Sequence, residues 1–460
     1  MSQSIGFYGA AQTVTGSKHL LTLNGKQVLV DCGIFQGSRE LKERNWQPFP
    51  FVPRDLDAVV VTHAHMDHIG MLPKLVKEGY QGPIYCTPAT IGLSKISLPD
   101  SGRIQEEDAR NANKYGSRHD PALPLYTEQE AYTCLKRFVP VHYHDFQPLP
   151  GGGTFRYLPA GHILGSAFAE IYFDDGQRIL MGGDLGRFDT PLIKDPTLVE
   201  FAEYLVVEST YGNRTHADEN PAERLEEIIA DAFQIGGAVL LPSFSIGRTQ
   251  ELLYYLRELQ NAGRMPRIPI FIDSPMAISA TRLYADCKEE HDEDMKIAIS
   301  EDASPLEPSN LTLVRDREQS KALNRQPGPL IIIAGSGMAT GGRIVHHLKH
   351  RLSDPSTTVV FTGYQADGTL GRRILEGDPE VFIHRQPIHI RAKVTKLNSL
   401  SAHADGGEIM SWLGHFKTPP KRTFIVHGET DAQEVLRDRI RLELGWNVEI
   451  PSQGQQFELT

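Results

Sequence analysis

Short apolar blocks separated by turn signals dominate the N-terminal part of the chain. Residues 20–23 and 27–30 are apolar stretches on either side of Asn24-Gly25. Because Asn-Gly tolerates the positive φ angles of a two-residue turn, this segment predicts a β-hairpin. Another apolar strand at 57–62 runs directly into a histidine-rich segment. Further strands are expected at 156–158, 167–173, 178–181, 391–394 and 423–426.

The middle of the chain has a different pattern, in which strands and helices alternate from about residue 205. A helix is expected from Asn220-Pro221, because Asn caps a helix and Pro fits its first position. Helices are also expected at 102–116, 127–138, 247–260, 276–290, 341–352 and near 431, and strands at 205–207, 238–241, 268–272, 330–333 and 358–362. This alternation predicts an α/β architecture with a mostly parallel sheet.

Length and composition add an expectation of two domains. The 460 residues (51.2 kDa) exceed what a single core usually holds. Apolar residues make up 40% and charged residues 23%, which is ordinary for a globular protein. No apolar run of about 18 residues predicts a membrane span, and no secretory signal is seen.

Charge and cysteine content restrict the chemistry further. The net charge is 47 − 58 = −11, so the overall field does not attract nucleic acid, and any polyanion must bind at a local site. The four cysteines lie far apart without a CxxC pair. This spacing excludes a disulfide framework or a thiolate zinc site and favours the reducing cytoplasm.

The segment HAHMDH at residues 63–68 is the strongest chemical signal. On an extended segment His63 and His65 face the same side and can share one ion. Asp67 and His68 lie beyond the turn and can reach a second ion. Imidazole and carboxylate ligands without thiolate suit zinc, manganese or iron. The alternative is a polar surface loop, which such a dense group of ligands at a strand end disfavours.

Two later residues are suitable additional ligands. His162 follows a short strand, and Asp184 follows Gly182-Gly183 at the end of another. A carboxylate can bridge two cations. Alone, His162 is more often a structural histidine and Asp184 a turn former, so only their combination with residues 63–68 makes them candidates.

These motifs, in this order, resemble the metallo-β-lactamase fold. Asp31 at a strand end completes the series. Glu208 in VVESTYG, His403 in SAHAD and His427 in VHGE resemble the three additional motifs of the β-CASP nucleases, which include the nuclease subunit of the pre-mRNA 3′-end cleavage factor. The resemblance covers nearly the whole chain. The histidine at position 427 is similar to the RNA-cutting branch rather than to the DNA-cutting one.

The resemblance implies an αββα sandwich interrupted by an inserted α/β domain. The implied boundaries are 1–209 and 389–460 for the sandwich and 210–388 for the β-CASP domain. Two Zn²⁺ ions are implied, with Mn²⁺ as the alternative. One ion would be held by His63, His65, His162 and Asp184, and the other by Asp67, His68, Asp184 and His427. Asp31 is implied to be a structural buttress.

Phosphodiester cleavage needs an activated water, charge neutralisation and a proton for the leaving oxygen. Two cations about 3.5–4 Å apart can supply the first two requirements. Asp67, Glu208 and His403 are the candidate catalytic residues: His403 is the natural general acid, and Glu208 would fix its tautomer. The alternatives are a capping or core histidine for His403 and a salt-bridged strand end for Glu208.

Glycine-rich turns in the inserted segment are candidates for binding phosphate. Residues 334–343 (AGSGMATGGR) run from a strand into a helix, and such turns present backbone N–H groups to anions. They match neither the P-loop nor the dinucleotide fingerprint. Ser336, Gly337 and, from a similar turn, Arg248 are the candidates. Tight packing and a cross-link within the domain are the respective alternatives.

The sequence therefore predicts a two-metal hydrolase of single-stranded RNA. Another hydrolase of the same fold, acting on lactones, thioesters, β-lactams or DNA, would leave His403, His427 or the insert unexplained. Diiron flavoproteins resemble the pattern HxExD at the metal motif, and this chain has His65 at the position of the glutamate. A non-catalytic partner subunit would have lost ligands. Cleavage mode, RNA target and metal stay open, and a homodimer is expected.

Overall fold

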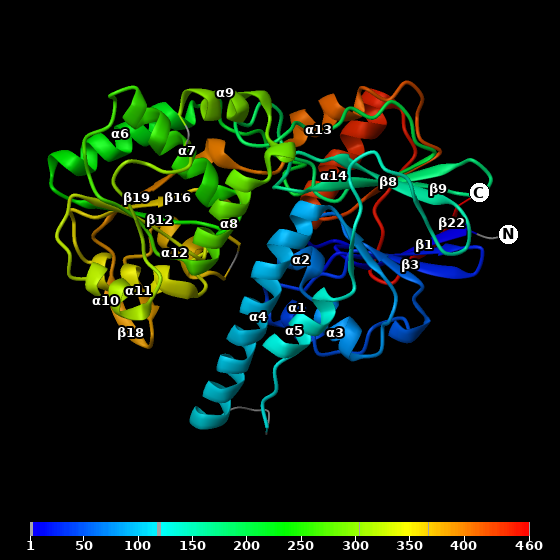
Figure 1. The fold of residues 1–460 in the computed structure, drawn as a ribbon, viewed down its shortest axis with the longest axis horizontal. Helices are drawn as coiled ribbons and strands as arrows, with labels where there is room; N and C mark the ends of the chain where they lie inside the picture. Colours follow the sequence, from blue (N-terminus) through cyan, green and yellow to red (C-terminus); the bar gives the residue numbers. More distant parts are fainter. Residues whose placement is uncertain (1–2, 117–120, 303, 367, 460) are drawn as a thin grey trace. The chain divides into compact units, whose positions relative to one another are not determined.

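The computed structural model describes residues 3–116, 121–302, 304–366 and 368–459. The chain forms two compact units (Figure 1). The first unit comprises Met1–Thr190, Lys194–Thr215 and His403–Thr460, and the second comprises Pro191–Ile193 and His216–Ala402. The domain boundaries that the resemblance implies stay a prediction.

The first unit contains two seven-stranded sheets that differ in strand order. The first sheet has the order β22 (Gln456–Leu459), β1 (Gln3–Gly9), β2 (Lys18–Leu23), β3 (Lys26–Val30), β4 (Ala58–Val60), β5 (Ile84–Cys86) and β6 (Phe138–Pro140). Strands β2 and β3 pair antiparallel around Asn24 and Gly25, whose φ angles are 51° and 81°. The hairpin expected from Asn-Gly is thus confirmed. From β3 to β6 the pairing is parallel.

The second sheet of this unit gathers strands from distant parts of the chain. Its order is β21 (Val448–Glu449), β20 (Arg422–Ile425), β11 (Tyr204–Val207), β10 (Arg178–Met181), β9 (Ala167–Tyr172), β8 (Thr154–Pro159) and β7 (Gln147–Pro148). β11 pairs in parallel with both β10 and β20. The C-terminal segment therefore supplies an integral part of this sheet.

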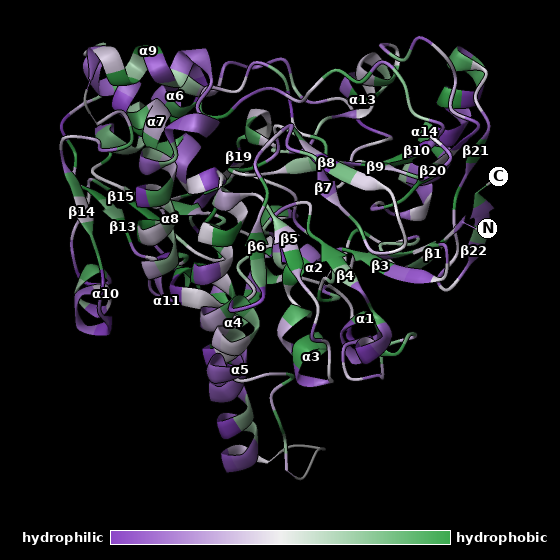
Figure 2. Ribbon diagram, turned by 45° about the vertical axis from the view of Figure 1, so that its right-hand side comes forward, coloured by the Kyte–Doolittle hydropathy of each residue, from purple (hydrophilic) through white to green (hydrophobic). Residues whose placement is uncertain are grey.

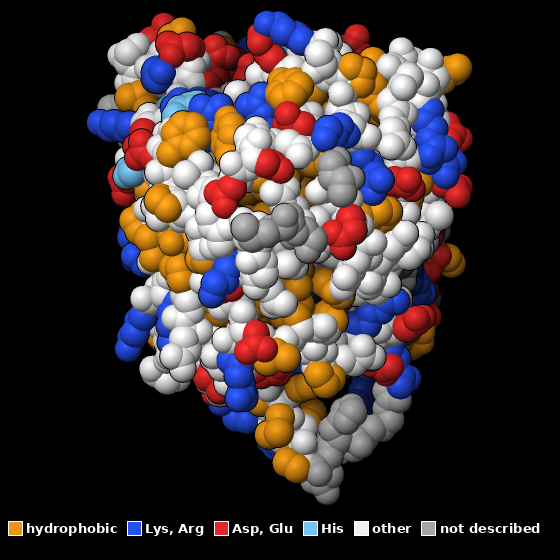
Figure 3. Space-filling view, turned by 90° about the vertical axis from the view of Figure 1, so that its right-hand side faces the viewer, with side chains coloured by type: hydrophobic (Ala, Val, Ile, Leu, Met, Phe, Trp, Pro, Cys, Tyr) orange, Lys and Arg blue, Asp and Glu red, His pale blue; other side chains and the backbone are white. Residues whose placement is uncertain are grey.

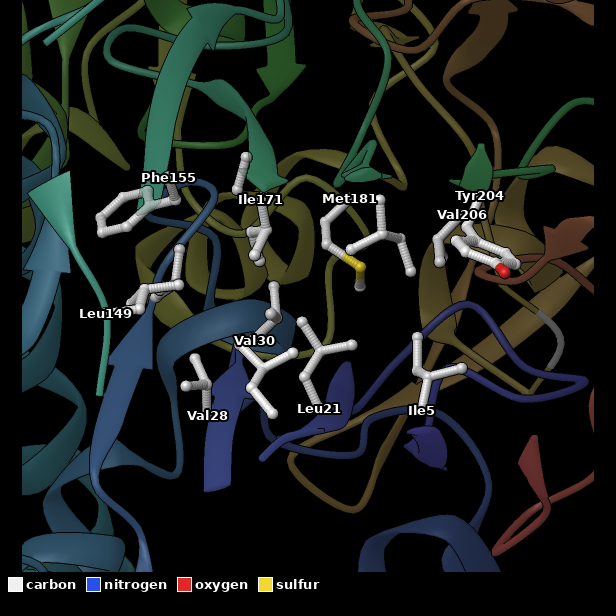
Figure 4. Packing of buried hydrophobic residues seen from close by; sticks show 14 of the residues in the cluster. Ile5, Leu21, Val28, Val30, Leu149, Phe155, Ile171, Met181, Tyr204 and Val206 are labelled. Carbon is white, nitrogen blue, oxygen red and sulfur yellow. The ribbon is translucent and has the colours of Figure 1, made fainter. Parts of the chain in front are cut away.

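The core of the first unit lies between the two sheets. Val30 and Leu21 of the first sheet face Ile171 and Met181 of the second (Figure 4). These side chains alternate with outward-facing ones because successive residues of a strand point to opposite faces. Phe155 and Tyr157, both fully buried, extend this core toward the edge of the second sheet.

Helices cover the outer faces of both sheets, which gives the sandwich that the resemblance implies. The helices α1–α5 lie on the outer side of the first sheet (Figures 1 and 2), and α13 and α14 pack on the outer face of the second. Their bounds are α1 (Arg39–Arg44), α2 (Met66–Ile69), α3 (Leu72–Lys77), α4 (Pro88–Tyr115), α5 (Glu128–Leu135), α13 (Gly406–Leu413) and α14 (Thr430–Arg439). In this unit a 3-10 turn occupies Pro53–Asp55 and a π-helical turn occupies Ile440–Leu444, whereas the 3-10 turn at Asn398–Leu400 belongs to the second unit.

Helix α4 is longer than the sequence pattern predicts. It starts at Pro88 rather than near residue 102, and Pro99 lies within it. Pro99 disfavours a helix in the sequence before residue 102, but the burial of Leu93 and Leu98 stabilises helical structure there. The second half of α4 is hydrophilic (Figure 2). Within the described residues, none of the helices is both long and apolar enough to cross a membrane.

The second unit is built on a six-stranded parallel sheet. Its order is β14 (Leu311–Leu313), β13 (Ile270–Ile272), β15 (Leu330–Ala334), β12 (Ala238–Pro242), β16 (Thr358–Phe361) and β19 (Lys393–Lys396). A separate hairpin joins β17 (Glu380–Ile383) and β18 (Gln386–His389). The mostly parallel sheet expected from the alternating pattern is therefore confirmed.

Helices cover both faces of this sheet. Ile331 and Ile333 of β15 pack on the side of α6, α7 and α8, whereas Leu330 and Ile332 pack on the side of α10, α11 and α12. The bounds are α6 (Pro221–Gln234), α7 (Arg248–Asn261), α8 (Pro275–Asp286), α9 (Glu293–Glu301), α10 (Arg317–Leu323), α11 (Gly342–Arg351) and α12 (Leu370–Leu375), with a 3-10 turn at Lys288–Glu290. The helix expected over 276–290 thus divides at Cys287.

Candidate metal centre

Strand ends of the two sheets in the first unit position all the predicted metal ligands. β4 leads to His63, β8 to His162, β10 to Asp184 and β20 to His427. Each of these strands has a hydrogen-bonded neighbour on both sides, so a buried scaffold fixes the start of each loop. Side chains far apart in sequence can therefore meet at one place.

The first group of ligands comprises three histidines and one carboxylate. His65 Nδ1 lies 3.2 Å from His63 Nε2 and 3.0 Å from His162 Nε2. Asp184 Oδ2 lies 3.3 Å from His63 Nε2 and 3.4 Å from His162 Nε2. A tetrahedral site with bonds of about 2.0–2.1 Å requires ligand atoms about 3.3 Å apart. These four atoms therefore fit a single zinc-sized ion.

The second group lies on the other side of Asp184. His68 Nε2 is 3.2 Å from His427 Nε2, and Asp67 Oδ2 is 3.4 Å from His427 Nε2. Asp184 Oδ1 is 3.2 Å from His68 Nε2. The structure thus brings together all seven predicted ligands, with one oxygen of Asp184 directed to each group.

An unsatisfied oxygen supports metal binding at this place. Asp184 is 2% exposed, and its Oδ1 accepts no hydrogen bond. A buried carboxylate oxygen without a donor is costly, and such groups in proteins are paired or coordinate metals. The donor set of imidazole and carboxylate is the set that zinc takes in hydrolytic sites. The residues present therefore fit the group that the resemblance implies.

Electrostatics keep most of these side chains in the state that a metal requires. Burial lowers the pKa of His63 and His162 and lowers the pKa of His65 to about 3, so these rings are neutral. Burial disfavours the charged form of Asp67 and Asp184, but the neighbouring histidines outweigh it and hold both pKa values below the ordinary range. Neutral imidazoles and ionised carboxylates are the binding forms.

Asp31 occupies the place of a buttress beneath this centre. Its Oδ2 accepts from His68 Nδ1 at 2.7 Å and from Thr62 Oγ1 at 2.8 Å, and its Oδ1 accepts from the Thr62 backbone N–H at 2.8 Å. A bond at Nδ1 leaves Nε2 of His68 directed at the second group. This is the usual way in which an outer carboxylate orients a ligand histidine.

Close backbone packing fixes the loop that carries Asp67. Gly33 N–H donates to Ser17 O, and Ser17 N–H donates to Asp67 O at 2.9 Å. A Cβ at Gly33 would lie 1.4 Å from Asp67 O, so only glycine fits there.

His403 and Glu208 form a pair beside the first group. His403 Nδ1 lies 2.9 Å from Glu208 Oε1, and the His403 ring centroid lies 4.4 Å from that of His162. Glu208 is fully buried and also accepts from the backbone N–H of Leu185 at 2.8 Å. Burial lowers the pKa of His403, but the charge and hydrogen bond of Glu208 outweigh it and raise the value to about 9.

The three candidates for phosphate binding lie in the second unit, at the carboxyl edge of its sheet. Arg248 begins α7, is 93% buried and donates from Nε to Glu251 at 2.9 Å. Ser336 and Gly337 belong to the turn between β15 and α11. Ser336 Oγ accepts from the backbone N–H of Thr340 at 3.0 Å. Their role in phosphate binding stays a prediction.

Comparison with known families matches three successive parts of the chain. Residues 26–232 match the beta-lactamase superfamily domain, residues 249–374 match the Beta-Casp domain, and residues 387–451 match the Zn-dependent metallo-hydrolase RNA specificity domain. The ribonuclease TTHA0252 of Thermus thermophilus is 40% identical over 92% of this chain and 93% of its own length. The chain belongs to the β-CASP family of metallo-β-lactamase proteins.

Archaeal β-CASP proteins are also similar to this chain. The transcription termination factors FttA of Methanosarcina mazei and Methanocaldococcus jannaschii are each 31% identical, over 92% and 95% of this chain. The chain spans 66% and 68% of their lengths. A solved structure of a protein of unknown function from Enterococcus faecalis has a TM-score of 0.59 with 14% identity and covers both chains fully, which shows the shared fold.

Three residues of the β-CASP centre carry no recognisable sequence pattern. Thr62 Oγ1 lies 3.1 Å from His63 Nδ1, and Thr210 Oγ1 lies 3.1 Å from His427 Nδ1, so each threonine orients a ligand. His19 on β2 is buried, and its Nδ1 has no hydrogen-bond partner. Thr62 lies two residues after the end of β4 and Thr210 three residues after the end of β11, and this place near a strand end is the one local signal that could have indicated them.

Proposed function

We propose that this β-CASP protein is a zinc-dependent ribonuclease that hydrolyses phosphodiester bonds of single-stranded RNA. The observation that supports this most directly is the division of seven ligands into two groups that share Asp184. Beside them lies the His403–Glu208 pair, which hydrolases of other chemistry on this fold do not require. The similarity to a protein named a ribonuclease agrees with this proposal.

Two Zn²⁺ ions, one in each ligand group, would polarise the phosphodiester and supply an activated water at neutral pH. His63, His65 and His162 would hold one ion, and Asp67, His68 and His427 the other, with Asp184 between them. Mn²⁺ is the alternative ion, since it accepts the same ligands.

The remaining chemistry falls to side chains of the chain itself. His403 would donate a proton from Nε2 to the leaving oxygen, because Glu208 engages Nδ1 and favours the protonated ring. Asp67, which remains ionised, would accept a hydrogen bond from the attacking water and orient it. Asp31, Thr62 and Thr210 would keep the ligand rings in register.

Because the net charge is −11, RNA must bind at local sites rather than through the overall electrostatic field of the protein. On the face seen in Figure 3, Lys and Arg side chains are interspersed with Asp and Glu, so this face offers no continuous basic surface to a polyanion. Phosphate contacts at defined positions can provide such local binding. Ser336, Gly337 and Arg248 are the proposed positions.

The proposal also includes a cytoplasmic location and a homodimeric assembly. Cys32, Cys86 and Cys134 are buried free thiols, which agrees with the reducing cytoplasm. A homodimer stays a prediction, and sedimentation equilibrium of the purified protein tests it.

The decisive experiment follows the fate of an RNA labelled at its 5′ end. Wild-type protein with Zn²⁺ is expected to shorten the RNA, and Asp67→Ala to leave it intact. The product ladder distinguishes internal cleavage from stepwise removal of nucleotides. Parallel incubations with single-stranded DNA and a chromogenic β-lactam separate the competing hydrolase activities. Wild-type protein that holds two ions per chain but leaves RNA intact would contradict the proposal.

A further inference from the structure

An exposed phenylalanine stands at the carboxyl edge of the sheet in the second unit. Phe244 follows β12 and is 41% exposed, whereas most large apolar side chains of this unit are buried. The carboxyl ends of parallel strands are where open α/β sheets bind their ligands. An aromatic face that is open to solvent at this edge is therefore available to a planar group.

The position of Phe244 is fixed by its surroundings. Its carbonyl accepts from Thr249 Oγ1 at 2.8 Å and from Ser243 Oγ at 3.2 Å. A Cβ at Gly337 would meet two atoms of the Phe244 ring at 2.8 Å, so the ring packs directly on this glycine. Gln365, buried behind them, ties the loops together by donating from Nε2 to Gly337 O and Gly363 O at 3.0 and 3.2 Å. A rigid aromatic platform loses little entropy when a ligand stacks on it.

A small notch beside Gly363 adjoins this ring. Apart from the residues next to it in the chain, a Cβ placed at Gly363 would have two atoms of the described residues within 4 Å. They are Arg248 Nη1 at 3.7 Å and Phe244 Cε2 at 3.9 Å. The notch therefore has a guanidinium N–H on one side and the edge of an aromatic ring on the other. Both carry positive partial charge, so the notch favours an anionic oxygen.

The arginine supplies an independent sign that a polar group belongs in this notch. Arg248 is 93% buried and uses Nε to bind Glu251, but its Nη1 is buried without a hydrogen-bond partner. A buried donor without an acceptor is unfavourable, and an oxygen in the notch would satisfy it. A bound water would do so, and so would a phosphodiester oxygen that enters the notch.

We propose that Phe244, Arg248 and Gly363 form a nucleotide subsite of the second unit. In it, the Phe244 ring stacks on a base of single-stranded RNA, and a phosphodiester oxygen enters the notch and accepts from Arg248 Nη1. The inference rests on the proposed function, because it names where that RNA is held. Since every base has a planar face, the subsite is tolerant of sequence.

Two substitutions test the two contacts separately. Phe244→Leu keeps an apolar side chain but removes the ring, and Phe244→Tyr restores a ring. Gly363→Ala fills the notch at ordinary contact distances, and the φ angle of Gly363 lies outside the left-handed region, so the fold tolerates alanine. Phe382→Leu is the matched control, because Phe382 is another phenylalanine of this unit and is 61% exposed.

Binding is measured by fluorescence anisotropy of a labelled 12-nucleotide uridine RNA between 50 and 200 mM KCl. All variants carry Asp67→Ala so that the RNA stays intact. Phe244→Leu is expected to weaken binding by about 5- to 150-fold, the range for loss of one stacked base, with affinity restored in Phe244→Tyr. Gly363→Ala is expected to reduce the slope of log K against log salt by about 0.7, the value for one phosphate of a single strand.

Each result has a defined meaning. Equal affinities of Phe244→Leu and Phe382→Leu would overturn the stacking contact. An unchanged salt slope in Gly363→Ala would overturn the phosphate contact and leave a bound water as the occupant of the notch. Wild-type protein that neither binds nor cleaves this RNA would instead refute the proposed function. Circular dichroism during heating verifies that each variant is folded.

Discussion

The imidazole of His403 and the carboxylate of Glu208 meet at 2.9 Å although 195 residues separate them in the chain. The carboxylate is fully buried and the ring is one-fifth exposed, so the pair joins a rigid interior group to a group that faces solvent. This arrangement holds Nδ1 and presents Nε2, as a general acid requires.

Removing the ring is expected to abolish proton donation without removing metal. His403→Ala should lower turnover on RNA by about 10²- to 10⁴-fold, the usual contribution of a general acid. Metal content, measured by mass spectrometry of the dialysed protein, should equal that of the wild type. A variant with full turnover and both ions would contradict the assignment.

Glu208→Gln tests whether the carboxylate acts through His403. The amide keeps the size of the side chain but loses the charge that favours the protonated ring, so turnover should fall less than in His403→Ala. The double variant should be no slower than His403→Ala alone, because residues that act as a unit are not additive. Additive losses would show that Glu208 has a separate role.

Asp184→Asn is expected to impair both metal groups at once. One oxygen of Asp184 faces each group, and an amide offers a single neutral acceptor in their place. Equilibrium dialysis should show fewer than two tightly held zinc ions per chain. Asp145→Asn, at an exposed position of the same unit, is the control and should retain both ions. Retention of two ions by Asp184→Asn would exclude the bridging role.

Metal removal is expected to destabilise the first unit more than the second. At a free metal concentration 1,000 times Kd, one site contributes about 4 kcal/mol. All three tryptophans, Trp46, Trp412 and Trp446, belong to the first unit, so their fluorescence reports its unfolding selectively. Chelation should shift this transition to lower urea concentration, and restored Zn²⁺ should reverse the shift. An identical midpoint with and without metal would contradict the ligand assignment.

A buried ion network in the second unit predicts a dependence of stability on pH. Asp273 accepts from His347 Nε2 at 2.7 Å and from Arg343 Nη1 at 2.6 Å. Burial disfavours the Asp273 carboxylate, but hydrogen bonds from His347, Ser320 and Arg343 outweigh it and lower its pKa from 3.8. Because the folded pKa is the lower one, this contribution is complete above the unfolded value and is lost as pH falls through the folded value.

Asp273→Asn should therefore destabilise this unit at pH 7 by about 3–5 kcal/mol, the cost of breaking a buried pair, and by less at pH 3. Hydrogen–deuterium exchange of peptides from β13 and α11 measures the effect locally. The exposed Asp218→Asn in the same unit provides the comparison. An equal loss of stability at both pH values would show that the charge of Asp273 is unimportant.

Structural features that depend on residues adjacent in the chain could be predicted from the sequence. The hairpin at Asn24-Gly25 could be predicted because backbone angles are a local property. The metal site could be predicted because four of its ligands lie within residues 63–68. The beginning of α4 was missed because Pro99 and the small residues around it oppose a helix, whereas burial against the rest of the unit stabilises one.

Residues that act through distant contacts left no such signal. Thr210 orients a histidine 217 positions away, and Asp273 meets His347 across 74 positions. The notch beside Gly363 depends on three loops that converge only in the folded sheet. Such relationships are set by packing, so no single segment of the sequence contains them.

The place of β20 and His427 in the first unit has a consequence for biosynthesis. β20 is inserted beside β11, and His427 completes the second ligand group, yet His427 lies 217 positions after Thr210 in the chain. Synthesis must therefore proceed through β20 and His427 before this ligand group is complete. We expect a nascent chain that has not yet reached β20 to lack the second ligand group and to leave RNA, its own messenger included, uncut.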